Sequence, residues 1–141
     1  MLTKKDIISI NDIVYRAGDA IMDIYDSSFE VETKSDNSPL TIADKKSHTI
    51  IDEGLKDIFP DTPILSEEGK AISYSERKNW KKFWLIDPLD GTKEFIKRNG
   101  EFTVNIALIK KNKPIIGVIY VPFCDTLYYG SDSSAFKVLN Y

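Results

Sequence analysis

The sequence comprises 141 residues, of which 42% are hydrophobic and 29% charged, as in an ordinary globular domain with a core of its own. Lysine and arginine number 19 against 22 aspartate and glutamate residues, and the net charge of −3 gives no basic field that would recruit a nucleic acid polymer. The single Cys124 excludes an internal disulfide, and the longest apolar run, residues 115–123, is too short for a transmembrane segment, so we expect a cytoplasmic protein.

The first part of the chain predicts two amphipathic helices. Apolar residues recur at helical spacing from Lys4 to Tyr25, and Thr3 with Asp6 resembles a capping box at the start of this helix. A second helix is predicted to begin at residues 41–44 and to end near residues 59–60. We expect the two helices to pack together.

The remaining pattern is that of short strands and loops. Loop chemistry fills residues 34–40, and a polar, exposed segment is expected between residues 71 and 81. Seven segments have the alternating or apolar pattern of strands: residues 29–33, 63–65, 83–86, 103–109, 115–121, 126–129 and 135–139.

The order of these elements indicates the fold class. Residues 103–109 and 115–121 are separated by a hairpin-length gap, so we expect them to pair antiparallel. Helices followed by antiparallel strands indicate an α+β fold, with two N-terminal helices packed on a mainly antiparallel sheet. No convincing boundary divides residues 1–141 into two domains.

An acidic turn follows the apolar strand at residues 83–86. Pro88 fixes φ and removes a backbone donor, so we expect the strand to stop there and the chain to turn. Asp87 and Asp90 can then point into one space, and Gly91 leaves room for a ligand to approach the backbone. If residues 92–95 open a helix, its free amides face the same space, which suits a phosphate group.

A second acidic pair, Glu67 and Glu68, follows the predicted strand at residues 63–65. Like charges at neighbouring strand ends repel unless a positive group neutralises them. Carboxylate and carbonyl oxygens are the ligands of Mg²⁺, so the two acidic strand ends predict a divalent-cation site. The alternative is an ordinary surface turn, because Asp, Pro and Gly are also typical turn residues.

These motifs carry a family resemblance. Glu67-Glu68 together with Asp87-Pro-Leu-Asp90-Gly-Thr92 resembles the metal signature of the inositol monophosphatase superfamily, whose members are Mg²⁺-dependent, lithium-sensitive phosphatases. The continuation Lys93-Glu94-Phe95 is similar to the CysQ-type 3′(2′),5′-bisphosphate nucleotidases, whereas inositol monophosphatases usually carry Thr-Asn-Phe there. Residues 34–44 and the pair Ser47-His48 match the same branch.

The resemblance implies how Mg²⁺ is held. Glu67, Asp87 and the backbone carbonyl of Leu89 would hold one ion, and Asp87 would bridge to a second ion shared with Asp90. Glu68 would stand behind these ligands rather than bind the metal. The implied substrate-binding residues are Glu67, Leu89, Asp90, Gly91 and Thr92.

The resemblance also implies the catalytic pair. Thr92 and Asp44 would orient and deprotonate a water molecule held by the metal, and the backbone amides of Gly91 and Thr92 would receive the phosphate. Metal lowers the pKa of water and neutralises phosphate charge, which makes this chemistry coherent. From the residues alone, the favoured interpretation is that Thr92 caps a helix and that Asp44 is a capping-box acid at the start of the second helix.

Three functions stay open at this point. The resemblance implies a phosphatase that removes the 3′-phosphate of 3′-phosphoadenosine 5′-phosphate, a small nucleotide bisphosphate, to give AMP and phosphate in sulfur assimilation. The first rival is a phosphatase of inositol phosphate or another sugar phosphate. The second is a catalytically silent metal-binding or assembly fragment.

One departure from the family concerns length. Members of the family continue into a second α/β half, in which a Trp-Asp-x-x-Ala-Gly motif supplies a third metal-binding aspartate, whereas this sequence stops at Tyr141. We therefore expect residues 1–141 to be the N-terminal, metal-binding half of such a phosphatase, with weak turnover or none. An open sheet edge and an uncovered apolar face would favour a homo-oligomer.

Overall fold

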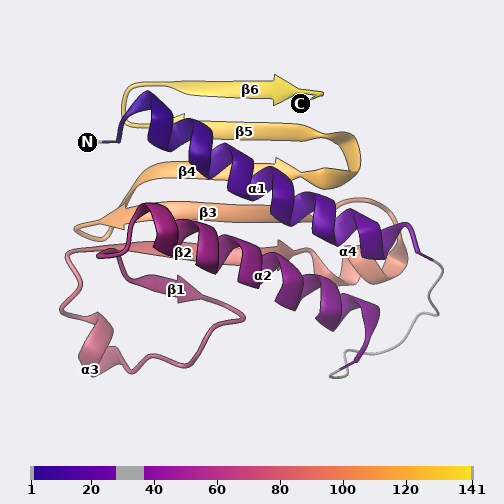
Figure 1. Ribbon diagram of the computed structural model, residues 1–141, viewed down its shortest axis with the longest axis horizontal. Coiled ribbons are helices and arrows are strands. Elements are labelled where there is room, and N and C mark those ends of the chain that lie inside the picture. The colour runs from indigo at the N-terminus through magenta and orange to yellow at the C-terminus, as the bar shows by residue number, and fades with distance from the viewer. Residues whose placement is uncertain (1, 28–36, 141) are drawn as a thin grey trace.

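The protein is described here from a computed structural model over residues 2–27 and 37–140. Two long helices, α1 (Lys4–Tyr25) and α2 (Pro39–Ile58), lie side by side across one face of a six-stranded sheet (Figure 1). The predicted α+β fold is therefore confirmed. The strand predicted at residues 29–33 and the first part of the loop predicted at residues 34–40 lie outside the described residues.

Helix α1 has the predicted bounds and the predicted cap. The backbone N–H of Asp6 donates to Thr3 Oγ1 at 3.2 Å, and the Thr3 N–H donates to Asp6 Oδ2 at 2.7 Å, which completes the capping box. Gly18 lies where this helix crosses the sheet, because a Cβ there would meet Tyr120 Cε1 at 2.3 Å. Only glycine allows so close an approach.

Helix α2 begins earlier than the sequence suggested. Its N-cap is Ser38, whose side chain accepts a hydrogen bond from the Thr41 N–H at 3.1 Å, and Pro39 occupies the first helical position. The predicted start at residues 41–44 was wrong. Pro39 is typical of a loop, which is why the prediction begins the helix after it, but the fixed φ of proline also suits the first turn of a helix. The end of α2 at Ile58, with Phe59 as C-cap, is confirmed.

The strands follow one another across the sheet in chain order. Among the described strands, β1 and β2 are the only parallel pair, and every other neighbouring pair is antiparallel. The remaining elements are the short helices α3 (Tyr74–Arg77) and α4 (Thr92–Lys97) and a 3₁₀ turn at Pro122–Cys124. The strands are β1 (Ile64–Ser66), β2 (Lys82–Asp90), β3 (Thr103–Lys110), β4 (Lys113–Val121), β5 (Thr126–Ser131) and β6 (Ala135–Leu139).

The hairpin between β3 and β4 is tighter than predicted. Lys110 pairs with Lys113, so only Lys111 and Asn112 form the turn, with φ of 50° and 59°. Positive φ at both central residues is typical of the type I′ turn, which matches the twist of paired strands.

The core lies between the two helices and the sheet. On β2, Trp84 and Ile86 face the helices and are buried, whereas Leu85 points to the other face and is 43% exposed. Ile119 and Tyr128 on β4 and β5 are exposed to a similar degree on that same face. The helices thus cover one face of the sheet, and the opposite face, which carries Leu85, Ile119 and Tyr128, is called the open face.

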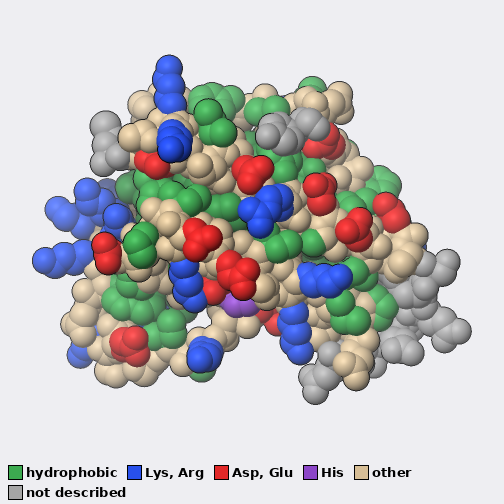
Figure 2. All heavy atoms as spheres, viewed as in Figure 1, with side chains coloured by type: hydrophobic (Ala, Val, Ile, Leu, Met, Phe, Trp, Pro, Cys, Tyr) green, Lys and Arg blue, Asp and Glu red, His purple; other side chains and the backbone are tan. Residues whose placement is uncertain are grey.

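The helix-covered surface carries charges of both signs, interspersed rather than gathered into one patch (Figure 2). Within residues 2–27 and 37–140, no helix is long and apolar enough to cross a membrane.

Candidate metal centre

Strand β2 carries the acidic motif through a β-bulge. Asp87 pairs with Asn105 and Asp90 pairs with Thr103, so two residues of β2, Pro88 and Leu89, stand opposite one residue of β3. The prediction that Pro88 ends the strand was therefore wrong, because the ladder resumes at Asp90. A bulge residue needs no ladder donor, so the missing N–H of Pro88 costs nothing there.

The bulge places both aspartates on the same face of the sheet. Side chains alternate along a regular strand, so positions three apart would point to opposite faces. The extra residue restores Asp90 to the open face that Asp87 occupies, while Pro88 and Leu89 are buried. Asn105 Nδ2 donates to Asp90 Oδ2 at 3.2 Å and holds that carboxylate in place. The predicted sharing of one space by Asp87 and Asp90 thus has a specific backbone cause.

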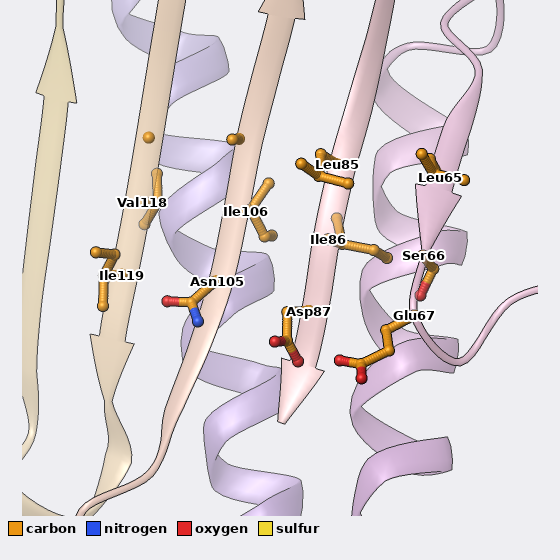
Figure 3. A pocket seen from close by; sticks show the side chains of 12 residues that line it. Leu65, Ser66, Glu67, Leu85, Ile86, Asp87, Asn105, Ile106, Val118 and Ile119 are labelled. Carbon is orange, nitrogen blue, oxygen red and sulfur yellow. The ribbon is translucent and has the colours of Figure 1, made fainter. Parts of the chain in front are cut away.

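Glu67 comes from the neighbouring strand end. Because β1 and β2 are parallel, their carboxyl ends meet at one edge of the sheet, and the Glu67 N–H donates to Ile86 O at 3.3 Å. Figure 3 shows the side chains of Glu67 and Asp87 pointing toward one another. They lie at one end of a groove of about 620 Å³ that runs over the open face, with Ala107 and Gly117 along its floor.

The electrostatics of Asp87 are those of a crowded carboxylate. Burial, together with the negative charges of Glu67 and Asp90, raises its pKa to about 7. Its Oδ1 is buried and has no hydrogen-bond partner among the described residues. A buried carboxylate oxygen without a donor, facing a second carboxylate, is an unfavourable arrangement that a cation would relieve.

The residues fit one divalent cation. Mg²⁺ usually takes one or two carboxylates and completes its shell with carbonyl oxygens, water and substrate phosphate, so Glu67 and Asp87 suffice as its charged ligands. In the part of the chain that the structure describes, no group of three or more Asp, Glu, His or Cys side chains is close enough to hold a metal ion. Leu89 and Asp90, predicted as further ligands, follow Asp87 on the same strand, and their part in binding a metal stays a prediction.

The two residues predicted as catalytic lie on helices next to the bulge. Helix α4 follows Gly91 directly, as predicted, and its first residue, Thr92, is half-buried. Asp44 lies in α2 and is buried, with 3% of its surface exposed. Glu68 follows Glu67 in the turn after β1 and is half-buried.

The capping interpretations of Thr92 and Asp44 are wrong. The residue at the N-cap of α4 is Gly91, which has φ of 90° and no side chain to form a cap, and Thr92 is already helical. The N-cap of α2 is Ser38, and no acidic residue lies in the first turn of this helix, so Asp44 is too far along it to act as a capping acid. Neither residue is explained by helix capping.

Sequence reasoning missed the supporting roles of Ser47 and Asn105. Ser47 Oγ donates to the carbonyl oxygen of Pro88 at 2.7 Å, although 41 positions separate the two residues. Asn105 binds Asp90 as described above, and its Nδ2 also contacts Thr103 Oγ1 at 3.1 Å. The sequence shows each of them as a polar residue within an otherwise apolar helix face or strand. It does not show which residue each one bonds, because that depends on the tertiary fold.

Together, the fold and this centre describe an α+β protein with a candidate divalent-cation site at two adjoining strand ends. The chain belongs to the inositol monophosphatase family, whose profile matches residues 4–137.

Individual relatives agree with the family match. The chain is 54% identical over 123 residues to the 3′(2′),5′-bisphosphate nucleotidase CysQ of Salmonella typhimurium, covering 86% of this chain and 50% of the relative. It is 47% identical over 126 residues to the protein of the same name in Haemophilus influenzae, covering 89% and 47%. A crystal structure of CysQ from Bacteroides thetaiotaomicron superposes with a TM-score of 0.89 at 46% identity, covering 97% of this chain and 50% of that one. The chain thus spans about half the length of the curated relatives it matches.

Proposed function

We propose that this chain carries the metal-binding half of a Mg²⁺-dependent phosphatase that removes the 3′-phosphate of 3′-phosphoadenosine 5′-phosphate, giving AMP and phosphate. The observation that carries this proposal is the pair Glu67 and Asp87, which face one another with the pKa of Asp87 raised to about 7. The choice of substrate is supported by relatives named bisphosphate nucleotidases. A place in sulfur assimilation is part of the same proposal and rests on the resemblance to that branch.

The residues divide the reaction among them. When bound, Mg²⁺ would lower the pKa of a water molecule and neutralise charge on the phosphate. Glu67, Asp87 and the Leu89 carbonyl are the ligands that this chain offers, and Asp90 borders a second position. Thr92 orients the attacking water, and Asp44 receives its proton.

The phosphate itself is held at the start of α4. The backbone N–H groups of Gly91 and Thr92 bind the phosphate oxygens, since free amides at a helix start favour negative charge. The bond from phosphorus to the 3′ oxygen breaks as the water oxygen bonds to phosphorus. The 3′ oxygen takes a proton from solvent and leaves as the hydroxyl of AMP, and Asp44 returns its proton to solvent.

A second proposal concerns this chain alone. Residues 1–141 span about half the length of these relatives, and we propose that they bind the cation by themselves, through Glu67 and Asp87. A third concerns the open face, which we propose associates with a second copy of the chain, since Leu85, Ile119 and Tyr128 leave apolar surface exposed there. The cytoplasmic location expected from the sequence stays a prediction.

The experiment that tests the function is release of inorganic phosphate by this chain, with and without Mg²⁺. The substrates are 3′-phosphoadenosine 5′-phosphate and inositol 1-phosphate, and the variants are Asp87→Asn and, as the matched control, Asp132→Asn in an exposed turn. Mg²⁺-dependent release from the nucleotide that only Asp87→Asn abolishes supports the proposal. Faster release from inositol 1-phosphate would instead support an inositol phosphatase. No release from either substrate would show that residues 1–141 by themselves do not catalyse the reaction.

A further inference from the structure

Two consecutive residues of α2 each reach one of the acidic strand ends. Ser47 Oγ donates to the Pro88 carbonyl oxygen at 2.7 Å, inside the bulge that separates Asp87 from Asp90. His48 Nδ1 shares a hydrogen bond of 2.9 Å with the hydroxyl of Ser66, the residue before Glu67. A single turn of one helix is therefore bonded to both strands that carry the cation site.

The bond from Ser47 stabilises the bulge. Ser47 is fully buried, with 0% of its surface exposed, and a buried backbone carbonyl without a donor is unfavourable. The bulge leaves the Pro88 carbonyl outside the regular ladder, so the serine hydroxyl provides the donor that it needs. Since the bulge is what puts both aspartates on the open face, Ser47 acts on the site through the backbone.

The bond from His48 acts on the other strand. β1 has only three residues, and the bond from Glu67 N–H to Ile86 O is long at 3.3 Å, so few interactions fix the direction of Glu67. The His48 ring also packs on the turn after Glu67, because a Cβ on Gly69 would lie 3.7 Å from His48 Cε1. His48 thus restrains the turn on both sides of the acidic residue.

We propose that Ser47 and His48 are positioning residues that set the separation between the Glu67 and Asp87 carboxylates, and through it the affinity for a divalent cation, without touching the ion. The effect on cation affinity rests on the proposed metal-dependent function, whereas the restraint on each strand end is a property of the metal-free chain. The simpler alternative is that both bonds only attach the helix to the sheet, in which case their loss would lower global stability and leave the site unchanged.

The first measurement is hydrogen exchange by segment in the metal-free chain. Ser47→Ala should accelerate exchange about tenfold in residues 87–91 alone, and His48→Ala in residues 66–69 alone, because each loses one restraint. Thr49→Ala is the matched control, since the Thr49 hydroxyl donates to Lys45 O within α2 at 2.9 Å and does not reach the sheet. A uniform acceleration over the whole chain would overturn the proposal.

The second measurement is titration with Mn²⁺, followed by the electron paramagnetic resonance signal of the free ion. Ser47→Ala and His48→Ala should each raise the Kd about tenfold, and Thr49→Ala should leave it unchanged. His48→Asn should restore affinity, because an asparagine side chain can place a polar atom where Nδ1 lies. Ser66→Ala combined with His48→Ala should cost no more than either change alone, since both remove the same bond.

The two measurements separate the proposals. Altered exchange with unaltered Mn²⁺ affinity in both variants would overturn the positioning role and leave the metal site standing. A wild-type chain that binds no Mn²⁺ would overturn the proposed function and the effect on affinity, while the segment-specific exchange would still decide whether Ser47 and His48 hold the strand ends.

Discussion

A Cβ on Gly91 would lie 2.8 Å from the carbonyl oxygen of Glu101, and Gly91 itself has φ of 90°. Both facts require glycine, because a backbone oxygen cannot rotate away and other residues are strained at this φ. Gly91→Ala should therefore lower the free energy of unfolding by about 1–3 kcal/mol, measured by urea denaturation. Since Gly91 joins Asp90 to α4, Mn²⁺ affinity should fall as well.

The matched control for this prediction is Gly117→Ala. No heavy atom lies within 4 Å of a Cβ at Gly117, and its φ is outside the left-handed region. Alanine in a strand is favoured over glycine by about 0.5–1 kcal/mol, so this variant should be neutral or slightly stabilised. Equal losses at the two glycines would contradict the argument from backbone contact.

The N-cap of α2 is a second sensitive point. Ser38 is 1% exposed, accepts a hydrogen bond from the Thr41 N–H and donates to Thr41 Oγ1 at 3.0 Å. Ser38→Ala should cost about 1–2 kcal/mol in thermal unfolding, because the cap is lost and a buried hydroxyl loses its partner. Ser73→Ala removes the exposed cap of the four-residue α3 and should cost less than about 0.5 kcal/mol. Similar costs at both caps would show that burying a cap does not increase its contribution to the free energy of unfolding.

Much of the fold was predictable because it depends on local pattern. The apolar spacing and the capping box gave the bounds of α1, and alternation gave β3 to β6, each from residues close in the sequence. The bulge was not predictable in this way. The rule that Pro88 cannot donate to a ladder is correct, but whether the strand ends or bulges depends on the residues of β3 that face it.

In the candidate site, too, local motifs were predictable and contacts that depend on the tertiary fold were not. Asp87, Asp90 and Glu67 are predicted as ligands from their motifs, since acidic residues at strand ends indicate a cation site on chemical grounds. The bond from Ser47 to Pro88 joins residues 41 positions apart, and nothing local in the sequence pairs them. Supporting contacts of this kind require the packing of α2 on the sheet, which depends on all of their neighbours at once.

The raised pKa of Asp87 makes stability depend on pH. Because burial and the charges of Glu67 and Asp90 raise the folded-state pKa from 3.8 to about 7, the folded chain holds its proton more tightly than the unfolded chain. This contribution to stability is fully present below pH about 4 and is lost as pH rises through about 7. Since the side chain is only half-buried, solvent screening limits the effect to about 1 kcal/mol.

Thermal unfolding of the metal-free chain between pH 4 and pH 8 tests this prediction. Asp87→Asn should remove the loss on the alkaline side and leave the variant more stable than wild type at pH 8. Saturating Mg²⁺ should have the same effect on the wild type, because the cation takes the place of the proton. Asp132→Asn, at an exposed position, should follow the wild-type profile. A wild-type profile identical to that of Asp87→Asn would contradict the crowding of these carboxylates.

The open face leads to a prediction about association. Ile119 is 45% exposed in the middle of β4, next to the groove, and burying an isoleucine side chain is worth about 1.5–3 kcal/mol. If copies of the chain meet through this face, Ile119→Lys should weaken their association constant at least tenfold, because each 1.4 kcal/mol is a factor of about ten. Ile8→Lys is the matched control, since Ile8 is 67% exposed but lies on α1, on the other side of the molecule. Size-exclusion chromatography with light scattering over a range of concentrations measures both variants. A wild-type chain that stays monomeric throughout, or equal weakening by both substitutions, would show that the open face does not pair.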